Sequence, residues 1–190
     1  MKVIFLDNDG VICLSNNWGS RYKKARKYMI DNGIPEYDTT MLNEIARPVS
    51  IRLDNFDTKA IAVLNSVLEQ TGAEIVVSSD WRFHATLEEL GEYYESQGII
   101  KKPIGVTDRI LYKTYADFPW NRKFDLEQTR SLEILEWLET RDDITHWVAI
   151  DDLDMSSRND WGLTNFVHTP FSNQGIKQSG VKDKLLKFLV

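Results

Sequence analysis

The 190-residue sequence contains a single cysteine, Cys13, and this scarcity excludes two kinds of site. One cysteine can neither form an intramolecular disulfide nor build a cysteine-based zinc cluster. Chains without disulfides are typical of reducing compartments, so we expect a cytoplasmic protein with no disulfide partner. We expect the Cys13 side chain to pack in the core.

Long apolar runs and an excess of positive charge are also missing. No stretch approaches the roughly 18 apolar residues of a membrane-spanning helix, and no signal-peptide pattern precedes the first apolar run. We therefore expect no membrane contact. With 23 basic and 29 acidic residues, the formal net charge is -6. This balance is not that of a protein that coats duplex nucleic acid.

Several ligand-binding motifs are absent too. The sequence has no HxH, CxxC, GxGxxG or Walker-type pattern, and its three histidines (His84, His146 and His168) lack metal-ligand spacing. It has no internal repeat. With 42% hydrophobic residues, the chain can form one soluble domain over residues 1–190, with room for a small insertion.

What the sequence does contain is an alternation of short apolar runs and helical patterns. This alternation predicts a three-layer, Rossmann-like α/β fold, in which a parallel sheet carries helices on both faces. The predicted strands cover residues 3–6, 74–77, 104–106, 147–150 and 165–167, and the predicted helices cover 57–72, 86–97, 125–141 and 182–189.

The core pattern lapses over residues 14–53. A helix is predicted over Arg21–Asp31, where five cations fall within seven residues, and a shorter one near Met41–Ala46, which we expect Pro48 to end. We interpret residues 14–53 as an insertion, and a basic insertion over an acidic site would attract phosphates. The alternative is an ordinary solvated basic helix.

Polar clusters follow three of the predicted strands. Asp7–Asp9 comes after the first strand, Ser78–Ser79 after the second and Asp151–Asp152 after the fourth. Ligands of parallel α/β sheets bind at the carboxyl ends of the strands, so these clusters are predicted to form one site. A lone aspartate at a strand end usually caps a turn, but three clusters at one sheet edge indicate a shared function.

Several carboxylates in one site require a cation. Like charges about 4 Å apart repel by roughly 4 kcal/mol in a partly screened protein environment. Carboxylate oxygens with open positions suit Mg²⁺, which completes its shell with substrate phosphate. The Ser78 hydroxyl and a cation such as Arg130 would hold phosphate oxygens. An ionised aspartate can then attack phosphorus, while Asp9 protonates the leaving oxygen and later activates water.

A family resemblance rests on five stretches of the sequence: FLDNDGVI, TGAEIVVSSDWR, IGVTD, TRSLEILEWL and VAIDDLDM. Together they resemble the haloacid dehalogenase (HAD) superfamily of phosphotransferases, and in particular the HAD domain of Swiss Army Knife RNA repair proteins. The resemblance covers nearly the whole chain, although no motif falls in Leu14–Leu53 or Asp108–Asp125. Because caps of this superfamily commonly enter just after the first motif, the resemblance implies that residues 14–53 form a small helical cap or lid.

The resemblance implies a role for each motif residue. Asp7 would be the nucleophile and Asp9 the general acid and base. Mg²⁺ would be held by Asp7, by Asp9 through its backbone carbonyl and by Asp151, with Asp152 assisting. Ser78 would bind the phosphate. Because HAD members without the second aspartate tend to be dehalogenases or phosphonate enzymes, Asp9 implies phosphate ester hydrolysis.

Two further positions concern this resemblance. The family needs a basic residue before the last acidic motif, and Arg130 is our prediction, with Arg122 and Lys123 as alternatives. Asn8 stands where the family usually has an apolar residue. We expect Asn8 to cap the turn, the alternative being a substrate contact.

Residues around the motifs are candidate substrate contacts. Trp18 and Tyr22 can stack on a base or simply pack. The loop over Arg109–Lys123 mixes aromatic and basic residues, as single-stranded nucleic-acid sites do, but an ordered surface loop can have the same composition. Trp81 is expected to pack beneath the strand-end turn, and Arg82 to contact substrate or a structural carboxylate. The substrate candidates are Ser79, Arg82, Lys123 and Lys24.

The leading hypothesis is a Mg²⁺-dependent phosphatase that acts through an aspartyl-phosphate on a nucleotide or the phosphorylated end of a single-stranded nucleic acid. One alternative is a small-metabolite phosphatase with the same mechanism, and another is a non-catalytic HAD-like domain that binds RNA or a partner. A response-regulator receiver domain also uses carboxylates and Mg²⁺ on a parallel sheet, but its acceptor aspartate follows the third strand. The sequence leaves the oligomeric state open.

Overall fold

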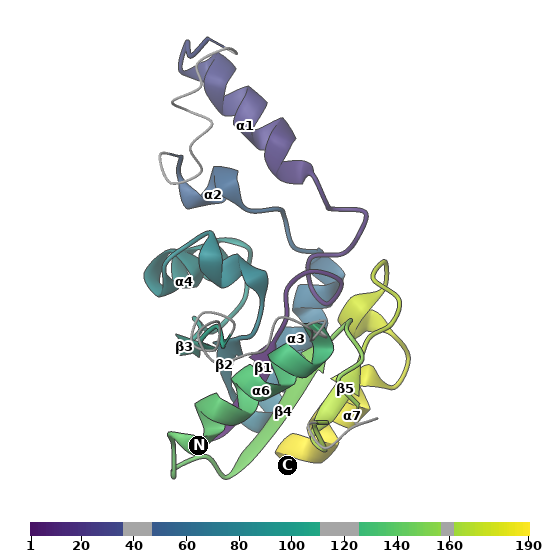
Figure 1. Ribbon diagram of the computed structural model, residues 1–190. Coiled ribbons are helices and arrows are strands. Elements are labelled where there is room, and N and C mark those ends of the chain that lie inside the picture. The colour runs from purple at the N-terminus through teal and green to yellow at the C-terminus, as the bar shows by residue number, and fades with distance from the viewer. Residues whose placement is uncertain (36–46, 111–125, 157–161) are drawn as a thin grey trace.

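The computed structural model describes residues 1–35, 47–110, 126–156 and 162–190. At its centre lies a five-stranded parallel sheet in the order β3-β2-β1-β4-β5 (Figure 1). The prediction of a parallel α/β sheet is confirmed. The strands are β1 (Lys2–Leu6), β2 (Glu74–Val77), β3 (Gly105–Val106), β4 (His146–Asp151) and β5 (Phe166–His168).

The central strand β1 is buried on both faces. Ile4 and Leu6 belong to the larger hydrophobic cluster, while Val3 and Phe5 belong to a second cluster on the opposite face. The Phe5 ring meets the Trp137 ring edge-on, with centroids 5.2 Å apart. A strand covered on both sides reads as a continuous apolar run rather than an alternating one, which is why VIFL was recognisable in the sequence.

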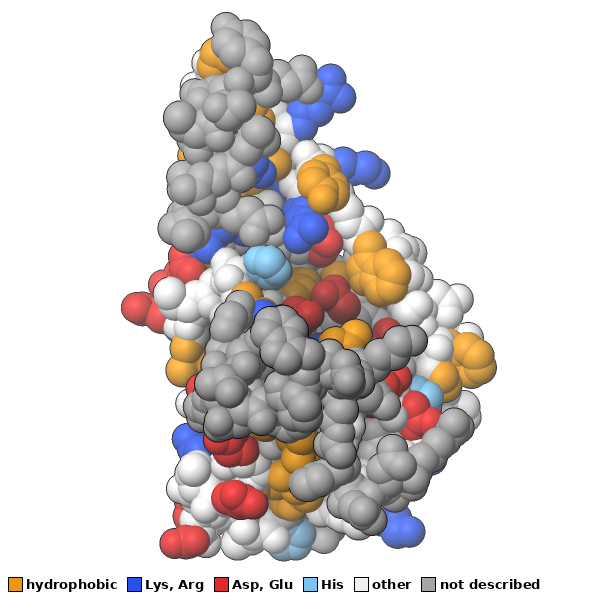
Figure 2. All heavy atoms as spheres, viewed as in Figure 1, with side chains coloured by type: hydrophobic (Ala, Val, Ile, Leu, Met, Phe, Trp, Pro, Cys, Tyr) orange, Lys and Arg blue, Asp and Glu red, His pale blue; other side chains and the backbone are white. Residues whose placement is uncertain are grey.

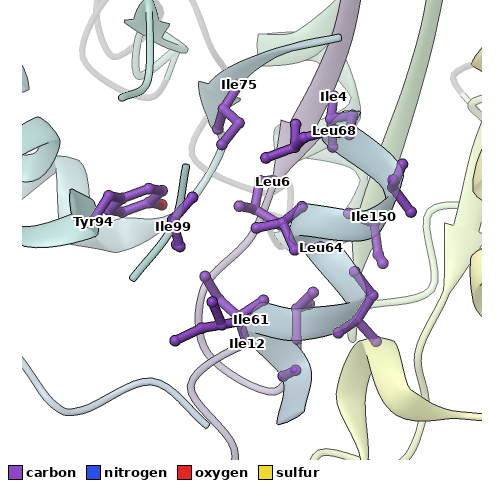
Figure 3. Close-up of a cluster of buried hydrophobic side chains, with 14 of the residues drawn as sticks. Ile4, Leu6, Ile12, Ile61, Leu64, Leu68, Ile75, Tyr94, Ile99 and Ile150 are labelled. Atoms are coloured by element: carbon purple, nitrogen blue, oxygen red, sulfur yellow. The ribbon is translucent and has the colours of Figure 1, made fainter. Parts of the chain in front are cut away.

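Helices cover the two faces. On the side of the larger cluster lie α3 (Thr58–Thr71), α4 (Leu87–Ser96) and α7 (Val181–Leu189), and α6 (Leu126–Glu139) packs on the second cluster. Figure 3 shows Leu68 and Leu64 of α3 beside Ile4 and Leu6 of the sheet. Ile61 of the same helix lies beside Ile12. Helices on both faces confirm the three-layer prediction. Among the helices of the described residues, none combines the length and the apolar character that a bilayer crossing requires.

Local sequence signals set several helix boundaries. The Asp57 side chain accepts a hydrogen bond of 2.9 Å from Ala60 N, and α3 ends at Gly72 in the left-handed conformation. Thr86 and Glu89 form a reciprocal capping box at the start of α4. These contacts satisfy backbone groups that the helix itself leaves unpaired.

The segment before α3 contains α1 (Ser20–Asp31) and α2 (Val49–Arg52), which stand beyond the carboxyl edge of the sheet in Figure 1. The predicted Arg21–Asp31 helix is present, whereas Met41–Ala46 lies outside the described residues. Whether Pro48 ends that helix therefore stays a prediction; in the described residues Pro48 is the N-cap of α2. Proline is tolerated at a helix start because the first N–H groups there have no intrahelical partner.

The strand order excludes the receiver alternative. Receiver domains have the order 2-1-3-4-5, with the first strand next to the third. Here β1 lies between β2 and β4. The acidic pair at 151–152 therefore arrives on the strand directly beside the first motif.

Candidate active site

Three motif segments meet at the carboxyl edge of the sheet. Leu6 at the end of β1 pairs with Val77 of β2 and with Ile150 of β4. Asp7, Ser78 and Asp151 are the next residues on these strands, so the sheet register places their backbones side by side. The three clusters share one edge of the sheet, as expected, because β1 lies between β2 and β4.

The chain after β1 turns around the backbone carbonyl of Asn8. This oxygen accepts hydrogen bonds from the N–H groups of Val11, Ile12 and Cys13 at 3.3, 3.0 and 2.8 Å. The Asn8 side chain is fully buried, and its Oδ1 accepts a 2.5 Å hydrogen bond from the Tyr94 hydroxyl. Asn8 therefore anchors the turn to α4 and serves a structural purpose.

Gly10 allows this turn to approach Asp152 closely. Its φ is +74°, and a Cβ atom at this position would lie 2.2 Å from Asp152 Oδ2. A φ in this range is strained for residues with a side chain. The glycine thus satisfies both a backbone requirement and a space requirement.

Asp7, Asp151 and Asp152 form a group that can hold a metal ion. One carboxylate oxygen from each lies within 4.8 Å of the others. Opposite ligands of an octahedral Mg²⁺ lie about 4.2 Å apart, twice the Mg–O distance, so this spacing suits the ion. The carboxylate of Asp9 does not belong to this group. The oxygen-only donor set fits a hard divalent cation.

Arg130 of α6 reaches into the same group. Its Nη1 donates hydrogen bonds to Asp7 Oδ1 at 2.8 Å and to Asp151 Oδ2 at 2.9 Å, and its Nη2 lies 3.5 Å from Asp80 Oδ1. The alternative cations, Arg122 and Lys123, lie outside the described residues. In the described part of the chain, the guanidinium of Arg130 links the first and last acidic motifs.

The electrostatics of the group favour a bound cation. Burial raises the pKa of Asp7 well above its ordinary value, and repulsion from Asp151 adds to the shift. Burial likewise raises the pKa of Asp151, and burial together with the charge of Asp151 raises the pKa of Asp152 to about 6. Arg130 opposes all three shifts. A divalent cation would favour the ionised carboxylates further.

Asp9 has a different environment from Asp7. Trp81 Nε1 donates a 2.9 Å hydrogen bond to Asp9 Oδ2, and the Trp81 ring stacks on Phe56 with centroids 5.1 Å apart. Burial raises the pKa of Asp9, and the Trp81 hydrogen bond opposes this shift. Trp81 was predicted only to pack. A buried indole requires an acceptor for its N–H. This requirement could have predicted that Trp81 contacts an acidic residue of the first motif.

Two buried hydroxyls lie beside the carboxylates. Ser78 and Ser79 are each 1% exposed. Within the described residues, neither Oγ atom has a hydrogen-bond partner. Ser78 is held by its backbone N–H, which donates to Leu6 O at 2.9 Å. Because buried polar groups are nearly always satisfied, two orphaned hydroxyls at a strand end suit the oxygens of a bound phosphate.

Arg82 forms a buried ion pair. It lies in η3 (Asp80–Phe83), and its Nη2 contacts Glu133 Oε2 of α6 at 2.6 Å, with both side chains at most 4% exposed. Its Nη1 donates to Thr107 Oγ1 at 3.0 Å. The expected contact with a structural carboxylate is therefore present, and it joins the Ser78 segment to the helix that carries Arg130.

The contacts of Lys24 are with the chain itself. Its Nζ donates to Leu53 O at 2.5 Å, to Asn55 Oδ1 at 2.9 Å and to the Tyr93 hydroxyl at 3.2 Å. These bonds attach α1 to the chain before α3 and to α4. Its ammonium group thus already has three protein acceptors. Substrate contact by Lys24 stays a prediction.

A cavity of about 410 Å³ opens next to Asp9; we call it the Asp9 pocket. Figure 2 shows this face of the molecule hollowed near its middle, with acidic and hydrophobic side chains gathered inside. The pocket lies between the segment before α3 and the η3 turn. His84, for which the sequence predicted no ligand role, belongs to its wall. Among the residues that the structure describes, the lining consists of Asp9, Trp18, Gly19, Arg21, Leu53, Asp54, Asp80, Trp81 and His84.

Comparison with known proteins gives one match. A family model described as the HAD domain in Swiss Army Knife RNA repair proteins matches residues 3–181. Neither the curated proteins nor the solved structures gave a match. The matched range contains all three strand-end motifs and α6.

Proposed function

The chain belongs to the family of HAD domains found in Swiss Army Knife RNA repair proteins, and from this premise we propose that it hydrolyses phosphate monoesters with Mg²⁺ through an aspartyl-phosphate. Family membership supports a phosphatase-type function. The observation that carries the full proposal is the meeting of Asp7, Asp151, Asp152 and Arg130 at one sheet edge, with Asp9 two residues from Asp7.

In the first step, a carboxylate oxygen of Asp7 attacks the substrate phosphorus. The bond from phosphorus to the leaving oxygen breaks, and a protonated Asp9 gives its proton to that oxygen, which departs as an alcohol. The raised pKa of Asp9 favours holding this proton. Arg130 helps keep the Asp7 carboxylate ionised despite its burial.

In the second step, the aspartyl-phosphate is hydrolysed. The Asp9 carboxylate takes a proton from a water molecule, whose oxygen attacks phosphorus. The bond from phosphorus to the Asp7 oxygen breaks, so Asp7 is again a carboxylate and Asp9 is again protonated. The two aspartates therefore need different environments, and the Trp81 hydrogen bond distinguishes Asp9 from Asp7.

Asp7, Asp151 and Asp152 would hold Mg²⁺, with the Asp9 carbonyl as a further ligand. The bound ion would withdraw charge from the phosphoryl oxygens. Ser78 and Ser79 would donate to those oxygens, because their buried hydroxyls have no partner among the described residues. Residues 14–53 act in this proposal as a small cap above the site.

The proposed substrate is a nucleotide or a nucleic-acid end. The family description, which refers to RNA repair proteins, supports a phosphorylated nucleic acid. The basic α1, with the sequence SRYKKARKYMID, supports an anionic substrate, and its Arg21 lines the Asp9 pocket.

The first test replaces the nucleophile. We expect Asp7→Asn to reduce hydrolysis of p-nitrophenyl phosphate by several orders of magnitude, because the neutral amide cannot form the phosphoryl ester. Steady-state rates measure this loss, and circular dichroism checks that the fold is retained. EDTA should inactivate the wild-type protein and Mg²⁺ should restore it. Unchanged turnover by Asp7→Asn would exclude Asp7 as the nucleophile.

A further inference from the structure

We propose that the Asp9 pocket binds a single nucleoside, the part of the substrate that leaves with the ester oxygen. The inference rests on the proposed phosphatase function, because that function places the leaving oxygen beside Asp9.

The position of the pocket fits a leaving group. Asp9 lines it, whereas Asp7, Asp151 and Asp152 do not. A group attached to the oxygen that Asp9 protonates would therefore extend into this cavity, away from the carboxylates proposed to bind the metal. Its volume of about 410 Å³ falls in the range of small-ligand pockets, which runs from about 300 to 1,000 Å³.

Trp18 provides a fixed aromatic surface in this pocket. The residue is 49% exposed, yet its Nε1 donates a 3.2 Å hydrogen bond to Cys13 O in the buried turn after the first motif. The indole is thus held by its polar edge while much of its surface stays open. Exposed aromatic rings fixed in this way are suitable platforms for a planar base, because little side-chain freedom is lost on binding.

The charge of the pocket argues against an anionic occupant. Among the described residues, its lining contains three acidic side chains (Asp9, Asp54 and Asp80) and one guanidinium, Arg21. A leaving group with a second phosphate inside the pocket would be repelled by these carboxylates. An uncharged nucleoside avoids this cost, and any further phosphate of a longer substrate would have to lie outside.

The same carboxylates require a ligand that donates hydrogen bonds. Asp54 Oδ1 accepts from Ser20 Oγ at 3.2 Å and from Arg21 N at 2.7 Å, which fixes the carboxylate at the pocket wall. Both of these bonds are accepted at Oδ1. Ribose hydroxyls and the exocyclic amino groups of bases are suitable donors.

A sugar also donates hydrogen bonds and also packs on tryptophan, so the test includes both ligands. The full-length Asp7→Asn protein, which cannot turn over substrate, is titrated with adenosine and cytidine by isothermal titration calorimetry. Glucose and ribose are titrated in parallel, and inorganic phosphate is added as a competitor. We expect both nucleosides to bind, the sugars to bind at least tenfold more weakly, and phosphate not to displace a nucleoside.

Two variants test the pocket in the same background. Trp18→Ala should weaken nucleoside binding about tenfold or more, the size of one lost stacking contact, whereas Trp18→Phe should retain most of the affinity. The matched control is Tyr28→Ala, which removes an aromatic residue of α1 that does not line the pocket. This control should bind nucleosides as the parent does.

Three results would overturn the proposal: no nucleoside binding, equal binding of glucose, or displacement by inorganic phosphate. Equal loss of affinity in Trp18→Phe and Trp18→Ala, with both proteins folded, would also contradict it. Because the calorimetric readout does not depend on catalysis, it stands even if Asp7→Asn shows that Asp7 is not a nucleophile. Failure of the pocket and failure of the proposed reaction are therefore distinguishable.

Discussion

At the scale of single residues, close approach between the first and last acidic motifs depends on Gly10. The side chain of Asp152 occupies the space where any other residue would place its Cβ atom. Glycine is therefore needed here for more than its conformational freedom. The Trp81 indole is a second important single residue. Its hydrogen bond to Asp9 gives this carboxyl group a different environment from that of Asp7.

Gly10→Ala is expected to lower both stability and Mg²⁺ affinity. The positive φ alone costs about 1–2 kcal/mol, and the new methyl group must also displace the Asp152 carboxylate. Urea unfolding and calorimetric titration of Mg²⁺ measure the two effects. Gly72→Ala is the matched control, since Gly72 has φ +68° but no atom within 4 Å of the added Cβ. The control should lose stability and keep its Mg²⁺ affinity.

Trp81→Phe should shift the pH dependence of catalysis. The Trp81 hydrogen bond lowers the pKa of Asp9, so its removal should raise that pKa, while the phenyl ring still packs on Phe56. Because the proposed first step needs a protonated Asp9, the alkaline limb of kcat/KM should move to higher pH. Trp147→Phe, on the other face of the sheet, serves as a control with no expected shift. A profile that does not move in Trp81→Phe would contradict the role of Asp9.

At the scale of elements, the orientation of α6 is set by the ion pair between Arg82 and Glu133. Arg130 and Glu133 are three residues apart on α6, so they lie on one side of the helix. Glu133 binds Arg82 of η3, while Arg130 binds Asp7 and Asp151. The segment after β2 and the cation that faces β1 and β4 are thereby held in one arrangement.

Glu133→Gln is expected to destabilise the fold by about 3–5 kcal/mol, because it leaves the buried Arg82 guanidinium without its counter-charge. It should also lower kcat, since α6 is no longer held where Arg130 meets Asp7. Urea unfolding and steady-state kinetics measure these changes. Lys27→Ala is the control: its pair with Asp31 is exposed on both sides, and losing it should cost less than about 1 kcal/mol. A cost for Glu133→Gln as small as that of the control would contradict the proposed role.

At the scale of the whole molecule, the acidic group makes the fold sensitive to protons and cations together. Asp7, Asp151 and Asp152 all have raised pKa values in the folded chain. The folded state therefore binds more protons than the unfolded state at pH values between the ordinary and the raised pKa. Stability must fall as the pH rises through this window.

For the metal-free protein in EDTA, we expect the free energy of unfolding to decrease as the pH rises from about 4 to above 6, the raised pKa of Asp152. Mg²⁺ should raise the melting temperature, and more strongly at high pH, because its ligands must be deprotonated. Urea unfolding across this pH range, with EDTA or with Mg²⁺, measures both effects. Asp152→Asn should flatten the pH dependence in EDTA. A metal-free protein that gains stability with rising pH would contradict this account.

The sequence by itself determined the parallel α/β fold and the meeting of its motifs at one edge. A buried strand leaves a continuous apolar signature, and residues that follow parallel strands must gather at one end of the sheet. Helix ends such as Asp57 and Thr86 were also readable, because capping is a local interaction. These features depend on neighbouring residues or on the general geometry of parallel sheets.

Only the tertiary structure decided the partners of individual side chains. Asn8 with Tyr94, Trp81 with Asp9 and Arg82 with Glu133 join residues 86, 72 and 51 positions apart. No local pattern specifies such pairs, because they depend on how helices settle on the sheet. The Asp9 pocket likewise exists only because the segment before α3 folds over the η3 turn. Sequence periodicity reports which face of an element is buried, and only packing decides what that face touches.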